Sequence, residues 1–373
     1  MIYFIDPMSY GNLAVYDYSL LSHNQNIEIL FFGSSLYDYK KNVLPTSFIP
    51  LFKYNKKKTS LKKAFSYTKS ICSLMFRILK DKPRLIHIQW IKFWYVDIIF
   101  LFFLKILKIK IVFTAHNVVP HESTMYVCRQ YKFYYKYVTD IIVHTKESKQ
   151  RLEEDFFVPN KKINVIPHGT LDLCTDKEAV RITKESIKKS LNIADQIVFS
   201  MLGLQSFYKG SDMVVKMWAR NVELHDKNKF ILLFWGKNEK IDTSSIDNIE
   251  NVNINNRYLT NEEFLAAMQL TSVLLMPYRD ISQSGVLLTA INESIPFLVS
   301  SAGSLSEPLS LVKAGWSIGE PNYENLENHV LSIARKKQEI IDIKNDKESW
   351  IFLQNEFSWN SIALETFKIY EKP

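Results

Sequence analysis

Glycine is scarce in this chain of 373 residues, and its scarcity disfavours several nucleotide-binding devices. Ten glycines are present, and no G-x-G-x-x-G fingerprint or Walker loop can be assembled from them. Dinucleotide-dependent dehydrogenases and P-loop phosphotransferases are therefore disfavoured. The sequence also lacks Asp-x-Asp and H-E-x-x-H motifs, so it offers no obvious metal ligands. We expect neither a metal ion nor a resident cofactor.

Cysteine and long apolar runs are sparse as well. Three widely spaced cysteines predict neither a disulfide framework nor a zinc site, which favours a reducing compartment. The most apolar stretch, residues 93–109, is interrupted by Asp97, Lys105 and Lys108 and falls short of the roughly 20 residues of a spanning helix. The first residues lack the basic segment of a secretory signal. We therefore expect a cytoplasmic protein.

Positive charge is in excess, with a net charge of +8, and it is concentrated between residues 53 and 84. Apolar residues alternate there with lysines, among them Lys56, Lys57, Lys58, Lys62 and Lys63. A basic amphipathic helix suits an anionic membrane surface, and a solvated surface helix is the alternative interpretation. No nucleic-acid-binding motif accompanies the charge, so a nucleic-acid partner is disfavoured.

Short β-rich runs alternate with segments of helical period, which is typical of parallel sheets with crossover helices. The first half predicts strands at 2–5, 27–32, 85–90, 110–114, 140–144 and 164–167. The second half predicts strands at 196–202, 230–235, 272–276 and 296–300, and helices at 211–223, 261–269, 285–293 and 322–337. A polar stretch from about 171 to 192 separates the two sets. The chain is long enough for two domains, each with its own core.

Two loops between a predicted strand and a predicted helix could hold an anion without metal. In the first, residues 203–212, Lys209 adds positive charge beside a helix N-terminus. In the second, residues 278–286, Ser284 is a good N-cap and Gly285 permits close backbone approach. First-turn amides and the helix dipole favour an anion there. Taken singly, each loop is also compatible with an ordinary capped helix or a solvated lysine.

Six segments carry a resemblance to one family. They are Gly203–Asp212, Pro277–Ala290, Ser301–Glu307, Val165–Gly169, Phe113–Glu122 and Phe357–Trp359. Together they resemble the motifs of family-four (group 1) glycosyltransferases with the GT-B fold. The resemblance implies an α/β protein of two Rossmann-like doubly wound domains facing across a cleft. The domains are expected at 1–172, binding acceptor, and 173–352, binding donor, with a C-terminal helix at 353–373 packing back on the first.

The family resemblance also implies an activity and a set of site residues. The activity is retaining, metal-independent transfer of a sugar from a UDP- or GDP-linked donor to a glycan or lipid-linked acceptor, in surface polysaccharide biosynthesis. Catalytic roles fall to Lys209 at the diphosphate, His116 near the sugar and Glu307 as a donor-side carboxylate. The donor-binding set is Gly11, Gly203, Ser206, Tyr278, Arg279, Gln283, Ser284, Gly285 and Val286. His121 and Glu122 are expected to bind acceptor, at the inner face of the cell membrane.

The chain departs from the family pattern at three positions. Ser206 stands where members often have arginine, and Ile281 and Thr289 stand where many have glutamates. We hypothesise that Arg279 supplies the missing cation. The departures keep two alternatives open: a sugar-nucleotide epimerase of the same fold, and a non-catalytic nucleotide-sugar-binding partner of another transferase.

Overall fold

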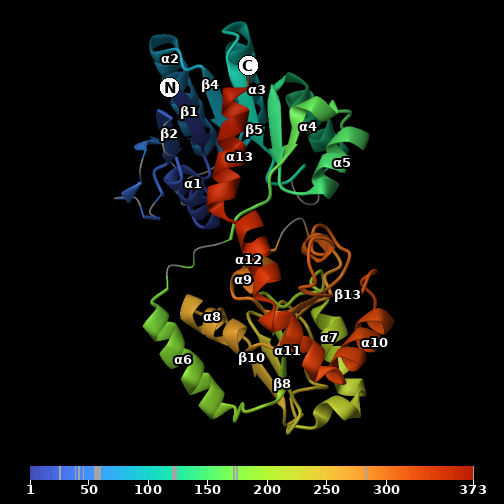
Figure 1. The fold of residues 1–373 in the computed structure, drawn as a ribbon. Helices are drawn as coiled ribbons and strands as arrows, with labels where there is room; N and C mark the ends of the chain where they lie inside the picture. Colours follow the sequence, from blue (N-terminus) through green and yellow to red (C-terminus); the bar gives the residue numbers. More distant parts are fainter. Residues whose placement is uncertain are drawn as a thin grey trace. The chain divides into compact units, whose positions relative to one another are not determined.

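The computed structural model describes residues 1–24, 27–37, 39–40, 43–44, 46–53, 60–119, 124–170, 173, 175–281 and 284–372. The chain forms two compact units, one of residues 1–169 and 358–373 and one of residues 170–357. Figure 1 shows that each unit is a β-sheet covered by helices. Within the described residues, no helix combines the length and apolarity needed to cross a bilayer.

The first unit is built on a parallel sheet with the strand order β3-β2-β1-β4-β5-β6-β7. The strands are β1 (Ile2–Asp6), β2 (Ile29–Ser34), β3 (Ser47–Phe52), β4 (Leu85–Ile88), β5 (Lys110–Thr114), β6 (Asp140–Val143) and β7 (Ile163–Val165). The helices are α1 (Asn12–Ser22), α2 (Ser60–Asp81), α3 (Trp94–Ile106), α4 (Met125–Tyr137), α5 (Lys146–Glu154) and α13 (Trp359–Glu371).

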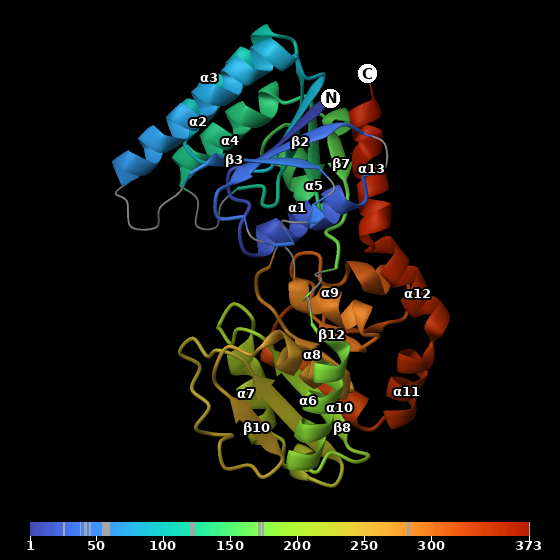
Figure 2. The same cartoon turned by 90° about the vertical axis from the view of Figure 1, so that its left-hand side faces the viewer.

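Successive side chains of each strand point to opposite faces of the sheet. Both faces are apolar here, and helices cover both. Ile2 and Phe4 of β1 pack toward α1 and α13. Tyr3 and Ile5 point to the opposite face, into a core shared with α2, α3, α4 and α5. Figure 2 shows α2, α3 and α4 side by side on this face. Their outer surfaces are therefore the outer surface of the unit.

The last helix belongs to the first unit, although it follows the second along the chain. Tyr370 on α13 has its hydroxyl 2.5 Å from Nδ1 of the buried His87, and Lys110 Nζ donates to the Ile369 carbonyl at 2.8 Å. Trp359 lies against Gly169, where an added Cβ would be 2.4 Å from the indole. α13 is thus joined to the sheet by packing and by hydrogen bonds.

The second unit has a parallel sheet with the order β10-β9-β8-β11-β12-β13. The strands are β8 (Ile197–Leu202), β9 (Phe230–Trp235), β10 (Val252–Asn255), β11 (Val273–Met276), β12 (Phe297–Val299) and β13 (Gly315–Ser317). The helices are α6 (Lys177–Ser190), α7 (Ser211–Arg220), α8 (Asn261–Leu270), α9 (Gly285–Asn292), α10 (Tyr323–Ala334), α11 (Lys337–Asn345) and α12 (Lys347–Glu356). Helix α6 packs on α8, α7 on α10 and α9 on α12.

The ten predicted strands are all present, and their ends differ from the predicted ends by at most two residues. Three further strands, β3, β10 and β13, were not predicted. Each is at the edge of its sheet, and none is a continuous run of buried residues. Edge strands pair on one side only and tolerate polar residues and proline, so they lack the apolar signal of central strands.

Candidate functional site

The strand order of each sheet reverses at one point, and open α/β sheets bind ligands at the carboxyl ends of the strands there. In the second unit the reversal lies between β8 and β11, which are neighbours although β9 and β10 separate them in the chain. The loops that follow these two strands are residues 203–210 and 277–284, of which 282 and 283 lie outside the described residues. They are the two loops in which the sequence predicts an anion site.

Glycines bring these two loops into backbone contact. Gly210 has φ +70°, and a Cβ there would lie 2.2 Å from the carbonyl oxygen of Pro277. Gly203 has φ +92°, and its Cβ position would be 3.5 Å from Cγ2 of Val286 and 3.7 Å from Nζ of Lys209. The lysine ammonium and the first turn of α9 therefore lie beside the same glycine.

Lys209 is the most unusual charge in this region. Its side chain is only 9% exposed, and Nζ has neither a hydrogen-bond acceptor nor an ion-pair partner among the described residues. The aromatic ring of Tyr278 lies 5.3 Å from Nζ. Burial lowers the pKa of Lys209 to about 8, against a smaller opposing effect of Glu239. A buried lysine normally has a counter-ion, so this arrangement offers a place for an anion.

The start of α9 supplies neutral donors next to this lysine. Ser284 is the N-cap, and its Oγ accepts a hydrogen bond from the Leu287 amide at 3.4 Å. The amides of the first turn have no acceptor within a helix and carry the positive end of the dipole. Gly285 and Val286 are the first two residues of that turn. Gln283 lies outside the described residues.

Arg279 is held by partners of its own. Its guanidinium donates to both carboxylate oxygens of Asp212, at 2.6 and 2.8 Å, and lies 3.9 Å from the ring centroid of Phe207. Nη1 also donates to the Phe207 carbonyl at 2.5 Å. Since Asp212 already matches the charge, this geometry favours a role in fixing the loop before α7. Direct donor contact by Arg279 stays a prediction.

The remaining predicted residues of the second unit lie on the same loops or the next one. The hydroxyl of Ser206 is buried without a partner among the described residues, and the Tyr278 carbonyl accepts from Ser300 at 2.6 Å. Glu307 is half-buried at the start of a 3-10 turn after β12. The absence of a side chain at Gly303 lets the loop after β12 approach the loop after β11, because a Cβ at Gly303 would be 1.9 Å from the Ile281 carbonyl oxygen.

In the first unit, His116 follows β5 and belongs to a chain of hydrogen bonds. Its Nε2 lies 2.9 Å from Oε1 of Gln89, and its Nδ1 lies 3.2 Å from Nε2 of His144. His144 Nδ1 is 2.9 Å from the Ile166 carbonyl oxygen. The indole of Trp90 stacks on His116 at 5.2 Å between ring centroids, with 10° between the planes.

The Ile166 carbonyl fixes which atom donates in each of these hydrogen bonds. A carbonyl only accepts, so His144 Nδ1 carries the proton. Burial lowers the pKa of His144 to about 3 and that of His116 well below its usual value, so both rings are neutral at pH 7. His144 Nε2 therefore accepts from His116 Nδ1, and Nε2 of His116 is an acceptor. The hydrogen that His116 Nε2 accepts comes either from the side-chain amide NH₂ of Gln89, if the oxygen and nitrogen of that amide are interchanged, or from the hydroxyl of a ligand.

Sequence reasoning missed two buried carboxyl groups near the reversal point of the first sheet, which lies between β1 and β4. They are Asp6, at the end of β1, and Asp17, on α1, each 1% exposed. Burial raises the pKa of Asp6 to about 7. Burial and the neighbouring Asp6 raise the pKa of Asp17 well above its usual value. The sequence held no signal for this pair, because only the packing of α1 on β1 brings it together.

Other predicted residues of the first unit can be placed only in part. Gly11 precedes α1 with φ +60° and ψ −136°, a conformation that favours glycine, and open space surrounds its Cβ position. His121 and Glu122 lie outside the described residues, as do Lys56, Lys57 and Lys58. Within the described ranges, no group of three or more His, Cys, Asp or Glu side chains is arranged to hold a metal.

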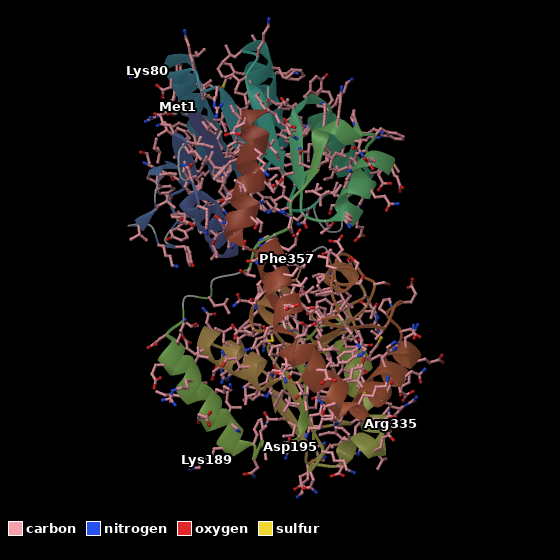
Figure 3. All side chains as sticks on the ribbon, viewed as in Figure 1. Met1, Lys80, Lys189, Asp195, Arg335 and Phe357 are labelled. Carbon is pink, nitrogen blue, oxygen red and sulfur yellow. The ribbon has the colours of Figure 1, made fainter. Side chains whose placement is uncertain are left out.

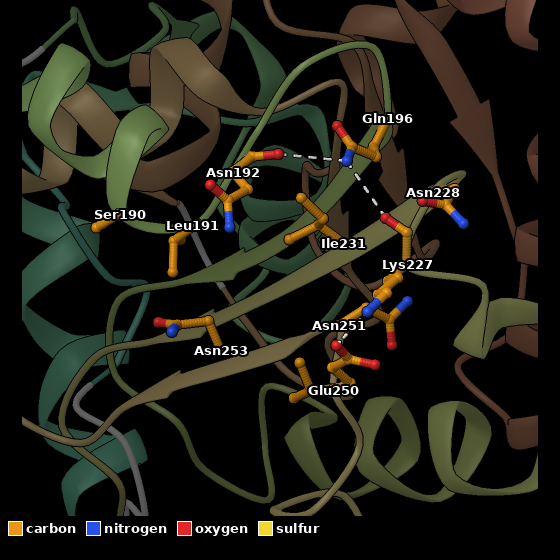
Figure 4. Close-up of a pocket in the computed structure, with 11 residues that line it drawn as sticks. Ser190, Leu191, Asn192, Gln196, Lys227, Asn228, Ile231, Glu250, Asn251 and Asn253 are labelled. Carbon is orange, nitrogen blue, oxygen red and sulfur yellow. Dashed lines mark hydrogen bonds and ion pairs between the residues drawn. The ribbon is translucent and has the colours of Figure 1, made fainter.

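A polar cavity of about 410 Å³ lies at the other end of the second sheet. Gln196, Lys227 and Glu250, which line it, precede β8, β9 and β10, so it opens at the amino ends of the strands (Figure 4). Ligands of open parallel sheets bind at the carboxyl ends. The cavity is therefore separate from the candidate site around Lys209.

Comparison with known proteins finds a family match for part of the chain. Residues 37–170 match the model of Glycosyltransferase Family 4. An uncharacterized glycosyltransferase of Methanocaldococcus jannaschii, MJ1059, is 25% identical over 182 residues. That alignment covers 48% of this chain and 41% of the relative, so the chain spans about two fifths of the relative's length.

Solved structures resemble the whole chain. Anabaena HepE in complex with UDP matches with a TM-score of 0.70 and 13% identity, covering 99% of both chains. Sucrose-phosphate synthase from Thermosynechococcus elongatus matches with a TM-score of 0.68 and 16% identity, covering 99% of this chain and 98% of the other. The family model thus matches part of the first unit, and the likeness to solved structures, which extends along both units, shows that the chain has the two-domain GT-B fold of these glycosyltransferases.

Proposed function

We propose that this protein transfers a sugar from a nucleoside diphosphate sugar to a glycan or lipid-linked acceptor. The observation that carries the proposal is the buried ammonium of Lys209, which has no counter-ion among the described residues and lies beside the start of α9. A diphosphate would supply the missing negative charge. Anabaena HepE, which shares the fold, was solved with UDP and with UDP-glucose.

Sugar transfer requires stabilisation of the charge that grows on the leaving diphosphate. Preorganised cations and amides in a site closed to water provide this stabilisation. We assign it to Lys209 and to the amides of Ser284, Gly285 and Val286, with Glu307 as the donor-side carboxylate. Fixed donors of this kind need no metal ion, so we propose a metal-independent reaction. We propose that it is retaining on the basis of the family resemblance alone.

His116 is proposed to contact the transferred sugar. The hydrogen-bond chain that ends at the Ile166 carbonyl leaves Nε2 of His116 as an acceptor. A sugar hydroxyl can donate to this nitrogen in place of the Gln89 amide. The role requires a neutral imidazole, which burial of the ring provides.

We further propose that the enzyme works at the cytoplasmic face of the membrane in surface polysaccharide biosynthesis. Support comes from the basic helix α2, whose lysines suit anionic headgroups. A lipid-linked acceptor would be presented at that surface. His121 and Glu122 stay predicted acceptor contacts.

A thermal-shift series with UDP, GDP and their glucose conjugates tests donor binding. Ligand stabilisation follows mass action, so the correct nucleotide should raise the melting temperature while nucleosides without phosphate should not. Turnover of the bound donor is then measured with and without a glycan acceptor. Transfer that depends on acceptor supports the proposal. Isomerisation of the donor without acceptor would indicate an epimerase, and binding without turnover would indicate a non-catalytic subunit.

A further inference from the structure

Helix α2 carries two apolar stripes, not the single apolar face suggested by its sequence. Ile71, Leu74 and Ile78 are buried in the core of the first unit. Phe65 and Phe76, in contrast, are 77% and 74% exposed, and they lie on the outer side of the helix with Leu61 and Leu79. Leu61, Phe65, Cys72, Phe76 and Leu79 recur at the helical period, so these exposed side chains share one face of the helix.

Helix α3, next to α2, repeats this arrangement. Tyr95, Ile99, Phe102 and Ile106 are exposed and follow each other at intervals of four, three and four residues. Ile99 is 62% and Ile106 78% exposed. The hydroxyls of Tyr95 and Tyr126 lie 3.1 Å apart, which links the start of α3 to the start of α4. The exposed stripes thus lie on helices that pack side by side (Figure 2).

The charges around these stripes are almost all positive. On α2, Lys62, Lys69, Arg77 and Lys80 form a basic row beside the apolar stripe. Figure 3 shows Lys80 at the outer end of α2. The carboxylates in the described part of residues 60–137 are Asp81, which accepts from Tyr3, and Asp97, which is buried and accepts from Tyr67.

We propose that the outer face of α2, α3 and α4 docks on an anionic lipid bilayer. The apolar stripes insert into the interface, and the lysines and arginines contact the headgroups. The positive charges of the basic row favour an anionic lipid surface as the partner of this face. A second copy of the chain joined through the same face would bring two basic rows together, which is repulsive. This inference deepens the proposed membrane location and does not depend on the donor chemistry.

The exposed apolar stripes and the basic row should contribute to vesicle binding in ways that can be measured separately. Each lysine near an anionic surface contributes about a fivefold gain in affinity, and salt screens it. Each inserted phenylalanine contributes about tenfold, independent of lipid charge. Charge variants should therefore lose binding to anionic vesicles at low salt. Apolar variants should lose it at every salt concentration.

Co-sedimentation with vesicles of equal parts phosphatidylglycerol and phosphatidylcholine tests the proposal. We compare Phe65→Ser/Phe76→Ser with a control pair of exposed apolar residues on the second unit, Ile351→Ser/Phe352→Ser. Partitioning should fall at least about tenfold for the first pair and stay unchanged for the control. Circular dichroism and the melting temperature without ligand establish that every variant is folded.

A matched charge experiment uses Lys62→Glu/Lys69→Glu and the control Lys188→Glu/Lys189→Glu on α6. Lys189, labelled in Figure 3, projects from α6 on the other unit. The first pair should bind anionic vesicles at least about 20-fold more weakly, and the control should bind as the wild type does. Sedimentation velocity without lipid should report a monomer.

Two outcomes would overturn the proposal. One is equal loss of vesicle binding in the α2 variants and their controls, which would indicate a non-specific effect of net charge. The other is a concentration-dependent dimer that Phe65→Ser/Phe76→Ser dissociates, which would assign the face to a second copy. If vesicles are bound as expected but UDP causes no thermal shift, the membrane surface stands and the donor assignment fails.

Discussion

Replacing Lys209 by methionine should stabilise the ligand-free protein and weaken donor binding at the same time. The ammonium is buried without a counter-ion among the described residues, and its pKa falls from 10.5 to about 8. A difference of one pKa unit corresponds to about 1.4 kcal/mol, so burying the charge costs roughly 3 kcal/mol at pH 7. Methionine preserves the length and apolar contacts of the side chain without this cost.

Burial of Lys209 also makes the stability of the protein depend on pH. Lys209 binds its proton less tightly in the folded state than in the unfolded state. The free energy of unfolding should therefore rise by up to roughly 3 kcal/mol as the pH increases from about 8 to 10.5. The Lys209→Met variant should lack this rise. Urea unfolding at pH 7, 8, 9 and 10, with Lys188→Met on α6 as the control, measures the difference.

Donor binding should change in the opposite direction. A charge-assisted hydrogen bond contributes about 1.5–3 kcal/mol, so UDP affinity should fall about 10- to 100-fold in Lys209→Met. Isothermal titration with UDP measures this loss, and the control variant should bind normally. A variant that is less stable than the wild type, yet binds UDP with unchanged affinity, would refute the counter-ion argument.

Three further predictions concern other parts of the two units. Gly210→Ala should cost about 2–4 kcal/mol in urea unfolding, whereas Gly319→Ala, at a similar φ of +66° in open space, should cost about 1 kcal/mol; equal losses would contradict the loop contact. Because burial raises the folded-state pKa of Asp6 to about 7 and that of Asp17 well above its usual value, the free energy of unfolding should fall by at least about 3 kcal/mol from pH 4 to 7, and Asp17→Asn should reduce this slope. The ring protons of His116 and His144 should show no titration shift between pH 5 and 8 by NMR, and a midpoint near 6.5 would contradict the neutral chain.

Strand positions, the fold class and the location of the two loops of the candidate site could be predicted from the sequence. Central strands such as β8 and β9 are continuous apolar runs because both faces of a parallel sheet are buried, and Ser284 and Gly285 mark a helix start by local backbone chemistry. Such signals depend on residues close together in the chain. The three edge strands β3, β10 and β13 escaped prediction because they are not continuous runs of buried residues.

Only the tertiary structure decided which charges and apolar groups find partners. Lys209 and Arg279 are both cations in predicted donor loops, but packing gives Arg279 a carboxylate and leaves Lys209 without one among the described residues. Asp6 and Asp17 meet because α1 folds onto β1, and α2 buries one of its apolar stripes while exposing the other. Burial and pairing depend on residues distant in sequence, so periodicity along one segment could not determine them.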